Sequence, residues 1–539
     1  MAIHVNQVGY RPNDVKIAYC TKPIEEFSVM TVDGEVVFTS KAKLGAINDP
    51  ASGDTLYELD FTSFQQPGTF RLSCGSEHSY FFRIAVDVYD GLKQALLKCL
   101  YYQRCGIALE PLYAGVWHHQ KCHDRQAKLY PSGHLIDVTG GWHDAGDYGR
   151  YIEPGAKAIA DLLTAYELFP LAFQEPVNIP ESGNGIPDIL NEVRYELEWF
   201  LKMQDPQTGG VYSKVTASRF PAMIMPEADV DQLYVYGFST TAAADFVAVM
   251  AMAARIYQQF DAQFSAICLE AARRAWAWLT VHNNTDYPSL AGQSLETGTG
   301  GYGDRHDVDE RYWAAAEMLR TTHDQKYHHY FADLYHQNFD KYEYTWNNVA
   351  GYGTIAYLRT PQKLVDPDLY QELLTGFLRR ADAWCQQCTL DGYGISLKPE
   401  DYVWGSNGVV MDRAMHLLIA NSLQANQEYV QAAQAHLHYL LGRNPMGICY
   451  VTGFGTNSVQ HPHHRPSQGD AVVEPVPGMV AGGPNCNLQD EISRVVFQNR
   501  VLSVPPAKRY LDHVESYATN EMTVYWNSPA VLVAAFFTL

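Results

Sequence analysis

Residues 238–281 read FSTTAAADFVAVMAMAARIYQQFDAQFSAICLEAARRAWAWLTV and contain two successive helical patterns, at about 238–259 and 262–281. Apolar residues recur there with the spacing of a helix that buries one face. The same spacing appears in other segments: 89–100, 153–169, 186–204, 307–321, 325–338, 369–387, 407–422, 426–442 and 526–538. The stretch 347–359 is a candidate for one more helix. So many helices, joined by long loops, favour a closed helical barrel that carries a site at one end.

The first 86 residues show a different pattern. Short alternating runs predict strands at 16–21, 27–32, 35–39, 56–61, 68–74 and 79–84. Asp33-Gly34 lies between two of these runs and is a strong hairpin signal, and Pro67-Gly68 marks another turn. We therefore expect a small immunoglobulin-like β-sandwich over residues 1–86, followed by the helical domain over residues 87–539.

Long segments rich in Gly, Pro, His and Asn separate the predicted helices, notably at 110–150, 205–236, 283–306 and 443–490. Loops of this length in a compact domain usually carry function. The candidate functional residues are therefore expected in these loops.

The composition excludes some function classes. The 539 residues include 60 acidic and 39 basic ones, a formal net charge of −21. An acidic surface repels phosphate groups, which argues against nucleic acid or an anionic membrane surface as a partner. Aromatic residues make up 13 %, with 36 Tyr and 10 Trp, which is more than a core requires. A flat, neutral, polar ligand such as carbohydrate would explain this surplus.

No apolar run reaches the roughly 18–20 residues of a transmembrane helix. The start, Met1–Val5, lacks the basic and apolar regions of a signal peptide. We expect a cytoplasmic protein, or a secreted one if a leader has been removed. The ten cysteines are scattered, which favours buried thiols or metal ligands over a disulfide framework. Cys385 and Cys388 have CxxC spacing but end a helical stretch, so we expect them to be structural.

The segment 140–150, GGWHDAGDYGR, places Asp144 and Asp147 three residues apart in a glycine-rich loop. Small residues let the backbone turn tightly and aim both carboxylates at one point, where they can hold and deprotonate a water. A calcium loop or a helix N-cap would also favour aspartate here.

Two later segments carry further candidates. Glu521 precedes an apolar C-terminal helix and is either a first-turn acid favoured by the helix dipole or a general acid. Residues 460–466, QHPHHRP, suggest metal binding or hydrogen bonding to a substrate, and the adjacent Arg465 favours the second.

The order of these motifs resembles glycoside hydrolase family 9, a family of cellulases, over essentially the whole chain. Val5–Tyr10 resembles the opening of the immunoglobulin-like module that precedes many family members. Further matching motifs are Gly185–Leu190, Asp309–Ala315, Trp404–Asn407, Leu441–Gly447, Pro462–Arg465, Gly482–Asn485 and Asn520-Glu521.

The resemblance implies an (α/α)6 barrel that hydrolyses β-1,4-glucosidic bonds with inversion. It implies that Asp147 is the general base, that Asp144 helps to hold the same water and that Glu521 is the general acid. By the same resemblance, His463 and Arg465 bind a glucose unit near the cleavage point. An inverting enzyme keeps its carboxyl groups roughly 6.5–9.5 Å apart, which leaves room for that water.

Aromatic residues near these motifs are candidates for the sugar cleft. Trp404 and Trp313 are candidate stacking platforms for pyranose rings, and Tyr517 is positioned to brace the site. A Trp at a helix start is otherwise most often part of the core.

Two thiols and two imidazoles are candidates for a structural zinc site: Cys105, Cys122, His123 and His143. These ligand types suit tetrahedral Zn²⁺ and argue against calcium. His118 and His119 are rival ligands, and a buried cysteine pair without metal is the alternative. Family members with the N-terminal module often carry such a zinc, and a zinc on His143 would anchor the loop that carries Asp144.

Calcium is expected at two acidic clusters. The first offers oxygen ligands around a turn, from Glu181, Asn184 and Asp188, and the second offers Asp304, Asp307 and Asp309. Either cluster could instead cap the helix that follows it. Family members often bind calcium, which supports both expectations, and no organic cofactor is expected.

The sequence therefore predicts a monomeric endoglucanase-type β-1,4-glucanase that acts on cellulose or cellodextrins. Alternatives are an exo-acting β-glucosidase, cellobiohydrolase or exo-β-glucosaminidase, if loops block one end of the cleft. A carbohydrate-binding protein without activity is disfavoured, because binding alone does not need three carboxylates. No binding module is expected after Leu539, which favours soluble oligosaccharides.

Overall fold

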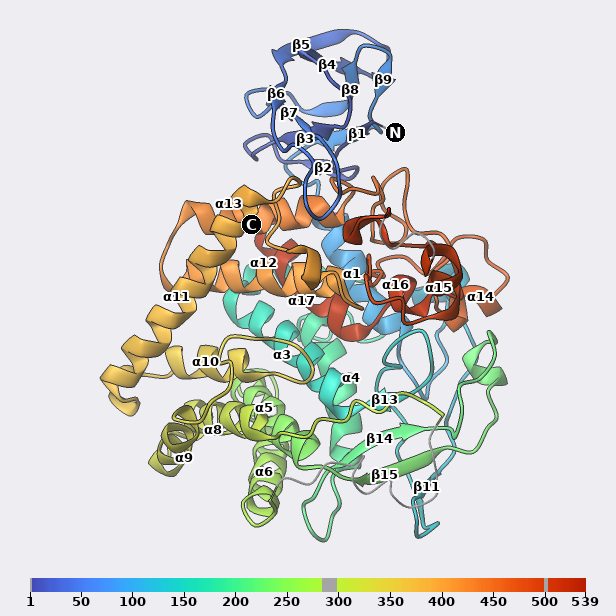
Figure 1. The fold of residues 1–539 in the computed structure, drawn as a ribbon. Coiled ribbons are helices and arrows are strands. Elements are labelled where there is room, and N and C mark those ends of the chain that lie inside the picture. The colour runs from blue at the N-terminus through green and yellow to red at the C-terminus, as the bar shows by residue number, and fades with distance from the viewer. Residues whose placement is uncertain (1, 284–297, 499–502) are drawn as a thin grey trace. The chain divides into compact units, whose positions relative to one another are not determined.

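The computed structural model describes residues 2–283, 298–498 and 503–539 (Figure 1). The chain forms two compact units that interleave along the sequence. One unit comprises residues 1–99, 381–467 and 471–539, and the other comprises residues 100–380 and 468–470. Each unit is described by itself below.

The N-terminal strands form two packed sheets, drawn in blue in Figure 1. One sheet has the order β1 (Ile3–His4), β3 (Ile17–Cys20), β7 (Tyr57–Asp60) and β6 (Lys43–Leu44). The other has the order β2 (Gly9–Tyr10), β10 (Phe82–Ile84), β8 (Gly68–Cys74), β4 (Glu26–Thr31) and β5 (Val36–Lys41), with β9 (Glu77–His78) beside β8. Their inward side chains share one buried core, which includes Phe27, Leu59 and Leu72. The predicted β-sandwich is confirmed.

The hairpin between β4 and β5 shows how the sequence sets this sandwich. Gly34 adopts a φ of +87°, a left-handed conformation that glycine tolerates without a Cβ clash. The backbone amide of Thr31 donates to the carbonyl of Glu35 at 2.9 Å, which closes the turn. Asp33-Gly34 thus forms the predicted turn.

The same unit contains a helical part. It includes α12 (Ser406–Leu423), α13 (Gln427–Leu440) and α17 (Val524–Phe536), and α12 packs against both of the others. Shorter helices are α15 (Glu491–Phe497) and α16 (Tyr517–Asn520), and α14 (Arg465–Gly469) begins in this unit and ends in the other. α1 (Asp90–Tyr102) and α11 (Pro367–Leu390) each continue from one unit into the other. The sandwich is tied to this part by Gln7, whose amide N–H donates to the carbonyl of Leu441 at 2.9 Å.

The second unit is built from inner and outer helices. The buried helices α3 (Ile152–Leu168), α5 (Thr240–Tyr257), α8 (Val308–Thr322) and α10 (Ala350–Leu358) follow one another in contact. The outer helices α4 (Asp188–Met203), α6 (Ala262–Leu279) and α9 (Gln325–Tyr335) pack on α3, α5 and α8 in turn. The short helix α2 (Pro111–Ala114) also belongs to this unit. The stretch 347–359, a candidate helix from its sequence, forms α10.

Two segments expected to be loops, 110–150 and 205–236, instead contribute strands to one sheet. Its order is β12 (Leu135–Ile136), β11 (Ala127–Leu129), β15 (Tyr234–Phe238), β14 (Tyr212–Thr216) and β13 (Arg150–Tyr151). Every residue of β14 is buried, so this strand lacks the alternation that reveals a half-exposed strand. Of the expected loop 283–306, residues 284–297 lie outside the described part of the chain.

None of the helices in the described residues is both long and apolar enough to cross a membrane.

Candidate active site and metal centre

The loop that carries Asp144 and Asp147 is held against helix α4. Gly141 has a φ of +77°, and a Cβ there would lie 2.7 Å from the ring of Trp199, so glycine is required on both counts. The next residue, Trp142, donates from its backbone N–H to Glu196 at 2.5 Å and from Nε1 to Glu192 at 2.8 Å. α4 thus fixes the entry of the loop.

The two aspartates lie together at the end of this loop, and both are buried. Asp144 accepts a hydrogen bond on Oδ2 from the hydroxyl of Tyr302 at 2.5 Å. Its backbone N–H donates to the carbonyl of Gly149, and the N–H of Gly149 donates to Oδ2 of Asp147, both at 2.9 Å. The loop therefore folds back on itself and orients both carboxyl groups.

The buried carboxyl group of Asp144 has a shifted pKa. Burial, together with the charge of Asp147, raises the pKa of the Asp144 carboxyl well above its usual range, and the hydrogen bond from Tyr302 acts in the opposite direction. Oδ1 of Asp144 is buried and makes no hydrogen bond to any described residue. Such an oxygen can bind a water molecule, which is what an aspartate assisting a hydrolytic base must do.

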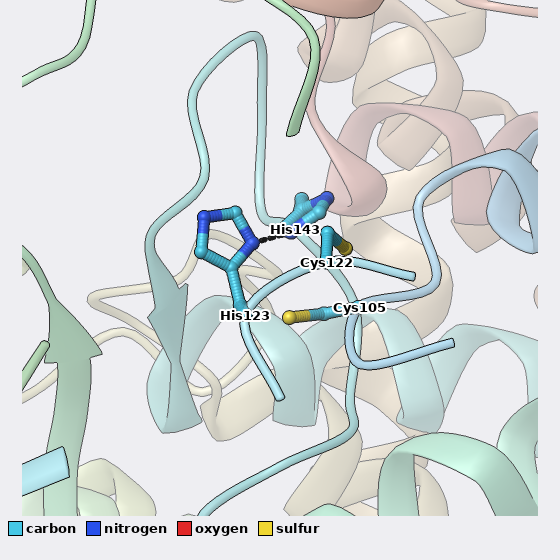
Figure 2. Close-up of side chains that lie close together, drawn as sticks. All are labelled: Cys105, Cys122, His123 and His143. Carbon is cyan, nitrogen blue, oxygen red and sulfur yellow. Dashed lines mark hydrogen bonds between the residues drawn. The ribbon is translucent and has the colours of Figure 1, made fainter. Parts of the chain in front are cut away.

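Four residues predicted to bind zinc come together in the same unit (Figure 2). The ligand atoms of Cys105, Cys122, His123 and His143 all lie within 4.8 Å of one another, and all four residues are buried. Two thiols and two imidazoles at this separation suit a closed tetrahedral site. The rival ligand His119 is outside the group, and its Nδ1 donates to a backbone carbonyl at 2.7 Å.

Charge in the cluster favours a bound cation. Burial alone would raise the pKa of Cys105, but the hydrogen bond with Cys122 and the charge of Arg150 hold the pKa of this thiol well below its ordinary value. A thiolate is the form of cysteine that binds metal. The residues present therefore fit a metal ion such as Zn²⁺.

Gln103 connects the metal cluster to the catalytic loop. Its carbonyl accepts the backbone N–H of His143 at 2.7 Å. Its side-chain amide donates to the carbonyls of His143 and Ala145 at 3.0 and 2.8 Å. Because these bonds flank Asp144, displacement of His143 would also displace that carboxylate.

Glu521 and His463 lie in the other unit, where they are neighbours on adjacent backbone segments. The N–H of His463 donates to the carbonyl of Asn520 at 3.0 Å, and the carbonyl of Glu521 accepts the N–H of Gly482 at 2.8 Å. Nδ1 of His463 donates to the carbonyl of Val514 at 2.6 Å, which orients the ring. Arg465 is buried and begins α14.

Aromatic rings surround this second group. Trp404 is 39 % exposed, and its ring centroid lies 5.4 Å from that of Tyr517. Tyr517 in turn contacts His463 edge-on at 5.8 Å. An exposed indole beside a bracing tyrosine retains a face for a sugar ring.

The prediction that Trp313 stacks on sugar is wrong. Its side chain is fully buried in α8, where the ring lies 5.2 Å from that of Tyr352. α10 approaches α8 so closely that a Cβ on Gly353 would lie 2.9 Å from Cα of Trp313. This indole belongs to the core.

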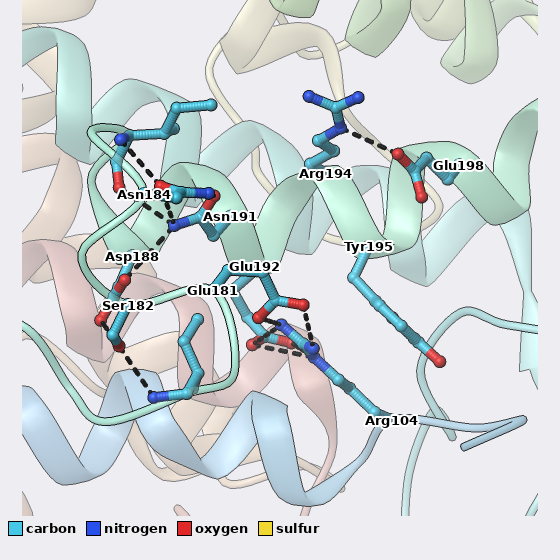
Figure 3. Close-up of polar contacts among 12 residues, drawn as sticks. Arg104, Glu181, Ser182, Asn184, Asp188, Asn191, Glu192, Arg194, Tyr195 and Glu198 are labelled. Carbon is cyan, nitrogen blue, oxygen red and sulfur yellow. Dashed lines mark hydrogen bonds and ion pairs between the residues drawn. The ribbon is translucent and has the colours of Figure 1, made fainter. Parts of the chain in front are cut away.

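The first predicted calcium cluster is engaged by protein donors (Figure 3). Both carboxylate oxygens of Glu181 accept hydrogen bonds from Arg104 at 3.0 Å. Oδ2 of Asp188 accepts from Ser182 at 2.6 Å, and Oδ1 of Asn184 accepts from a backbone amide at 2.9 Å. This donor set shapes the turn before α4 and does not fit a calcium ion.

In the second predicted cluster Asp307 pairs with Arg311 at 2.9 Å, which leaves Asp304 and Asp309 as the candidate ligands. Asp304, Asp307 and Asp309 line a cavity of about 530 Å³. The neighbouring Glu310 is fully buried, and neither of its carboxylate oxygens has a hydrogen-bond partner among the described residues. Burial raises the pKa of Asp304 and raises that of Asp309 to about 6.

Some residues that shape the site were missed by the sequence reasoning. Tyr302 follows a run of glycines, and Gln103 and Asp229, which accepts a hydrogen bond from His123, lie in segments without a recognisable motif. Their roles depend on contacts with residues far away in the chain, such as the 158 positions between Tyr302 and Asp144. No local signal could have revealed them.

Comparison with known proteins identifies the family. Residues 89–534 match glycosyl hydrolase family 9, and residues 1–79 match the cellulase N-terminal ig-like domain. The chain belongs to glycosyl hydrolase family 9. The expected fold is confirmed as an immunoglobulin-like sandwich followed by the helical (α/α)6 domain of this family of inverting glycoside hydrolases.

Individual family 9 members match over nearly the whole chain. A cellodextrinase of Butyrivibrio fibrisolvens is 36 % identical over 98 % of this chain and 98 % of its own length. Endoglucanase D of Acetivibrio thermocellus is 36 % identical over 99 % of this chain and 83 % of its own length. The crystal structure of a thermostable endoglucanase mutant from Alicyclobacillus acidocaldarius superimposes with a TM-score of 0.93 at 40 % identity, covering 100 % of this chain and 99 % of that one.

Proposed function

We propose that this family 9 protein is a β-1,4-glucanase that cleaves soluble β-1,4-linked glucans such as cellodextrins by an endo-type, inverting hydrolysis. The observation that carries the proposal is the buried Asp144–Asp147 pair, held by α4 and oriented by Tyr302 and Gly149. The similarity to a cellodextrinase over its full length supports the substrate class.

Hydrolysis of an acetal requires a base for the water and an acid for the leaving oxygen. We assign the base to Asp147, because the backbone N–H of Gly149 orients one of its oxygens and leaves the other for the water. Asp144, whose raised pKa favours its protonated form, helps to hold the same water. Glu521, half-exposed beside His463, is the proposed general acid that protonates the departing sugar.

Substrate contacts follow from the surroundings of Glu521. His463 and Arg465 supply hydrogen bonds to a glucose unit, since one is oriented through Nδ1 and the other begins a short helix at the same loop. Trp404 supplies an apolar face for a neighbouring pyranose ring, and Tyr517 braces it.

Two single substitutions test these roles. Glu521→Gln and Asp147→Asn should each lower kcat on cellopentaose by about 1,000-fold or more, because each removes an essential proton transfer. The exposed carboxylates Glu515 and Asp137 provide matched controls as Glu515→Gln and Asp137→Asn, which should retain near wild-type activity. Full activity in either test variant would contradict its assigned role.

The products test the reaction itself. Proton NMR of the first product should show the α-anomer, as inversion at a β-linkage requires. Products from end-labelled cellohexaose should include internal cleavage, whereas release of only glucose or cellobiose would establish exo action. Binding of cellopentaose without any cleavage would establish a carbohydrate-binding protein.

We also propose a structural Zn²⁺ at the four-residue cluster and a Ca²⁺ at Asp304 and Asp309. Zinc would supply no catalytic chemistry, since four protein ligands leave no open coordination position. A bound Ca²⁺ would balance the negative charge of the buried carboxyl groups near Glu310. Metal analysis of protein purified without chelator should find one zinc per chain, and Asp309→Asn should lower the calcium content.

A further inference from the structure

Lys214 is a buried lysine in the second unit, on the strand next to the catalytic loop. It lies in β14, where it pairs directly with Tyr151 of β13, and its side chain is 1 % exposed. Nζ donates to the carbonyl of Gly300 at 2.7 Å and to the hydroxyl of Thr299 at 3.3 Å. Lys214 therefore joins β14, the strand paired with β13 at the end of the catalytic loop, to the segment 299–300.

One set of contacts leads from Lys214 to Asp147. The ammonium nitrogen lies 5.6 Å from the ring centroid of Tyr151, a favourable cation–π distance. That ring packs against Gly149 so tightly that a Cβ on Gly149 would lie 2.6 Å from it. The N–H of Gly149 is the group that orients the carboxylate of Asp147.

A second set of contacts leads from Lys214 to Asp144. Gly300, whose carbonyl accepts from Nζ, lies two residues before Tyr302. Tyr302 has a φ of +42°, unusual for a side chain of this size, so its backbone needs support. Its ring contacts Tyr151 edge-on at 4.8 Å, and its hydroxyl donates to Asp144.

Burying the charged ammonium of Lys214 costs desolvation free energy, which a neutral hydrogen-bond donor would largely avoid. Burial lowers the pKa of Lys214 to about 8, and the charges of Asp147 and Glu153 act in the opposite direction. The groups around the ammonium include Asp147 and Glu153, the rings of Tyr151 and Tyr236, and the 299–300 segment. A buried charge is retained where its neighbours stabilise it, and here a candidate catalytic carboxylate contributes to that stabilisation.

We propose that Lys214 is a positioning residue for hydrolysis, which holds Asp147 through Tyr151 and Asp144 through Tyr302. The inference rests on the proposed function, because it concerns how the base side of that reaction is oriented. The contacts that carry this role are those of the Lys214 ammonium with the ring of Tyr151 and with the carbonyl of Gly300.

The test combines Lys214→Met, which keeps the side-chain length and removes the ammonium, with Tyr302→Phe in a double-mutant cycle on cellopentaose. Lys214→Met should lower kcat by about 10- to 100-fold, the range expected when a catalytic group is displaced, with KM within threefold of wild type. Tyr302→Phe should lower kcat by about 10-fold. If Lys214 acts through Tyr302, the double variant should be about as active as the weaker single variant.

Several outcomes would overturn the inference. They are a Lys214→Met variant within twofold of wild-type kcat, an effect confined to KM, or single effects that multiply in the double variant. The exposed Lys326 provides the matched control, since Lys326→Met should change neither constant. If Lys214→Met fails to fold, Thr299→Val, which removes one acceptor of the ammonium, takes its place in the cycle under the same criteria.

The result separates this inference from the proposed function. If wild-type protein does not cleave cellopentaose, the proposed function fails and no cycle is measured. If wild-type protein is active and Lys214→Met matches it, only the inference fails.

Discussion

Asp229 accepts a hydrogen bond from Nε2 of His123 at 3.3 Å, while Nδ1 of the same ring faces His143 at the same distance. The carboxylate of Asp229 can only accept, so Nε2 carries the proton and Nδ1 is the atom that would bind the proposed zinc. A carboxylate behind a histidine ligand orients the ring and makes the ligand more basic.

Removal of this carboxylate should weaken metal binding. Asp229→Ala is expected to lower zinc affinity by about 10- to 100-fold, the usual effect of losing such a partner, as measured by competition with a chromophoric chelator. Asp231→Asn is the matched control, because Asp231 forms an exposed ion pair with Arg219 outside the cluster. Equal zinc affinity in Asp229→Ala and wild type would contradict the assigned tautomer.

Loss of the metal should impair stability and catalysis together. Cys105→Ser is expected to abolish stoichiometric zinc, lower Tm and reduce kcat, since Gln103 couples His143 to the backbone around Asp144. Cys385→Ser provides the control, because Cys385 lies outside the cluster and should leave all three quantities unchanged. Zinc content by elemental analysis, thermal unfolding and cellopentaose kinetics are the measurements. Normal kcat in zinc-free protein would show that the two sites are independent.

The two tryptophans considered for stacking should respond differently. Trp404→Ala is expected to raise KM for cellopentaose about 3- to 10-fold, because an aromatic contact contributes about 0.5–1.5 kcal/mol beyond area burial. Trp404→Phe should restore most of the affinity. Trp313→Phe should lower Tm with little change in KM, because this ring is enclosed by α8 and α10. An unchanged KM in Trp404→Ala would exclude Trp404 from the substrate site.

His436 should make stability depend on acidity. Burial lowers the pKa of His436 to about 4, and Nε2 accepts hydrogen bonds from the N–H and hydroxyl of Ser396 while Nδ1 donates to Ala432. A proton on Nε2 would break the contact with Ser396. The unfolded chain binds that proton near pH 6.5, so between about pH 6.5 and 4 the unfolded state binds more protons and stability falls as the pH falls.

Denaturant unfolding at several pH values measures this effect. Between pH 7 and 5, His436→Gln should lose about 2 kcal/mol less stability than wild type, although it starts from a lower value. His461→Gln, a change at an exposed histidine, should follow the wild-type curve. Parallel curves for His436→Gln and wild type would show that His436 does not contribute to acid sensitivity.

Much of the fold could be predicted from the sequence, because the signals for these elements are local. The segments 238–259 and 262–281 form α5 and α6, and Asp33-Gly34 forms the hairpin between β4 and β5. The strands β11–β15 were not predicted, since they are short and β14 is buried along its whole length. A strand without alternating exposure gives no periodic signal.

Part of the candidate site could likewise be predicted from the sequence, and part could not. The residue types and order of the motifs were sufficient to predict Asp144, Asp147 and Glu521 as candidates, and the residue types predicted the group of Cys105, Cys122, His123 and His143, whose ligand atoms lie close together. The support around them was not predictable, because Tyr302 reaches Asp144 across 158 residues and no motif marks that contact.

The sequence by itself determined the family, the helical and strand segments and the identity of the chemistry-bearing residues, since periodicity and motif order reside in the chain. Only the tertiary structure decided which tryptophan is core and which is exposed, and that Arg104 and Ser182 occupy the oxygens of the first predicted calcium cluster. It alone placed the ammonium of Lys214 beside the ring of Tyr151 and the carbonyl of Gly300. Burial and hydrogen-bond partners depend on how distant segments pack, and that information is absent from any single stretch of sequence.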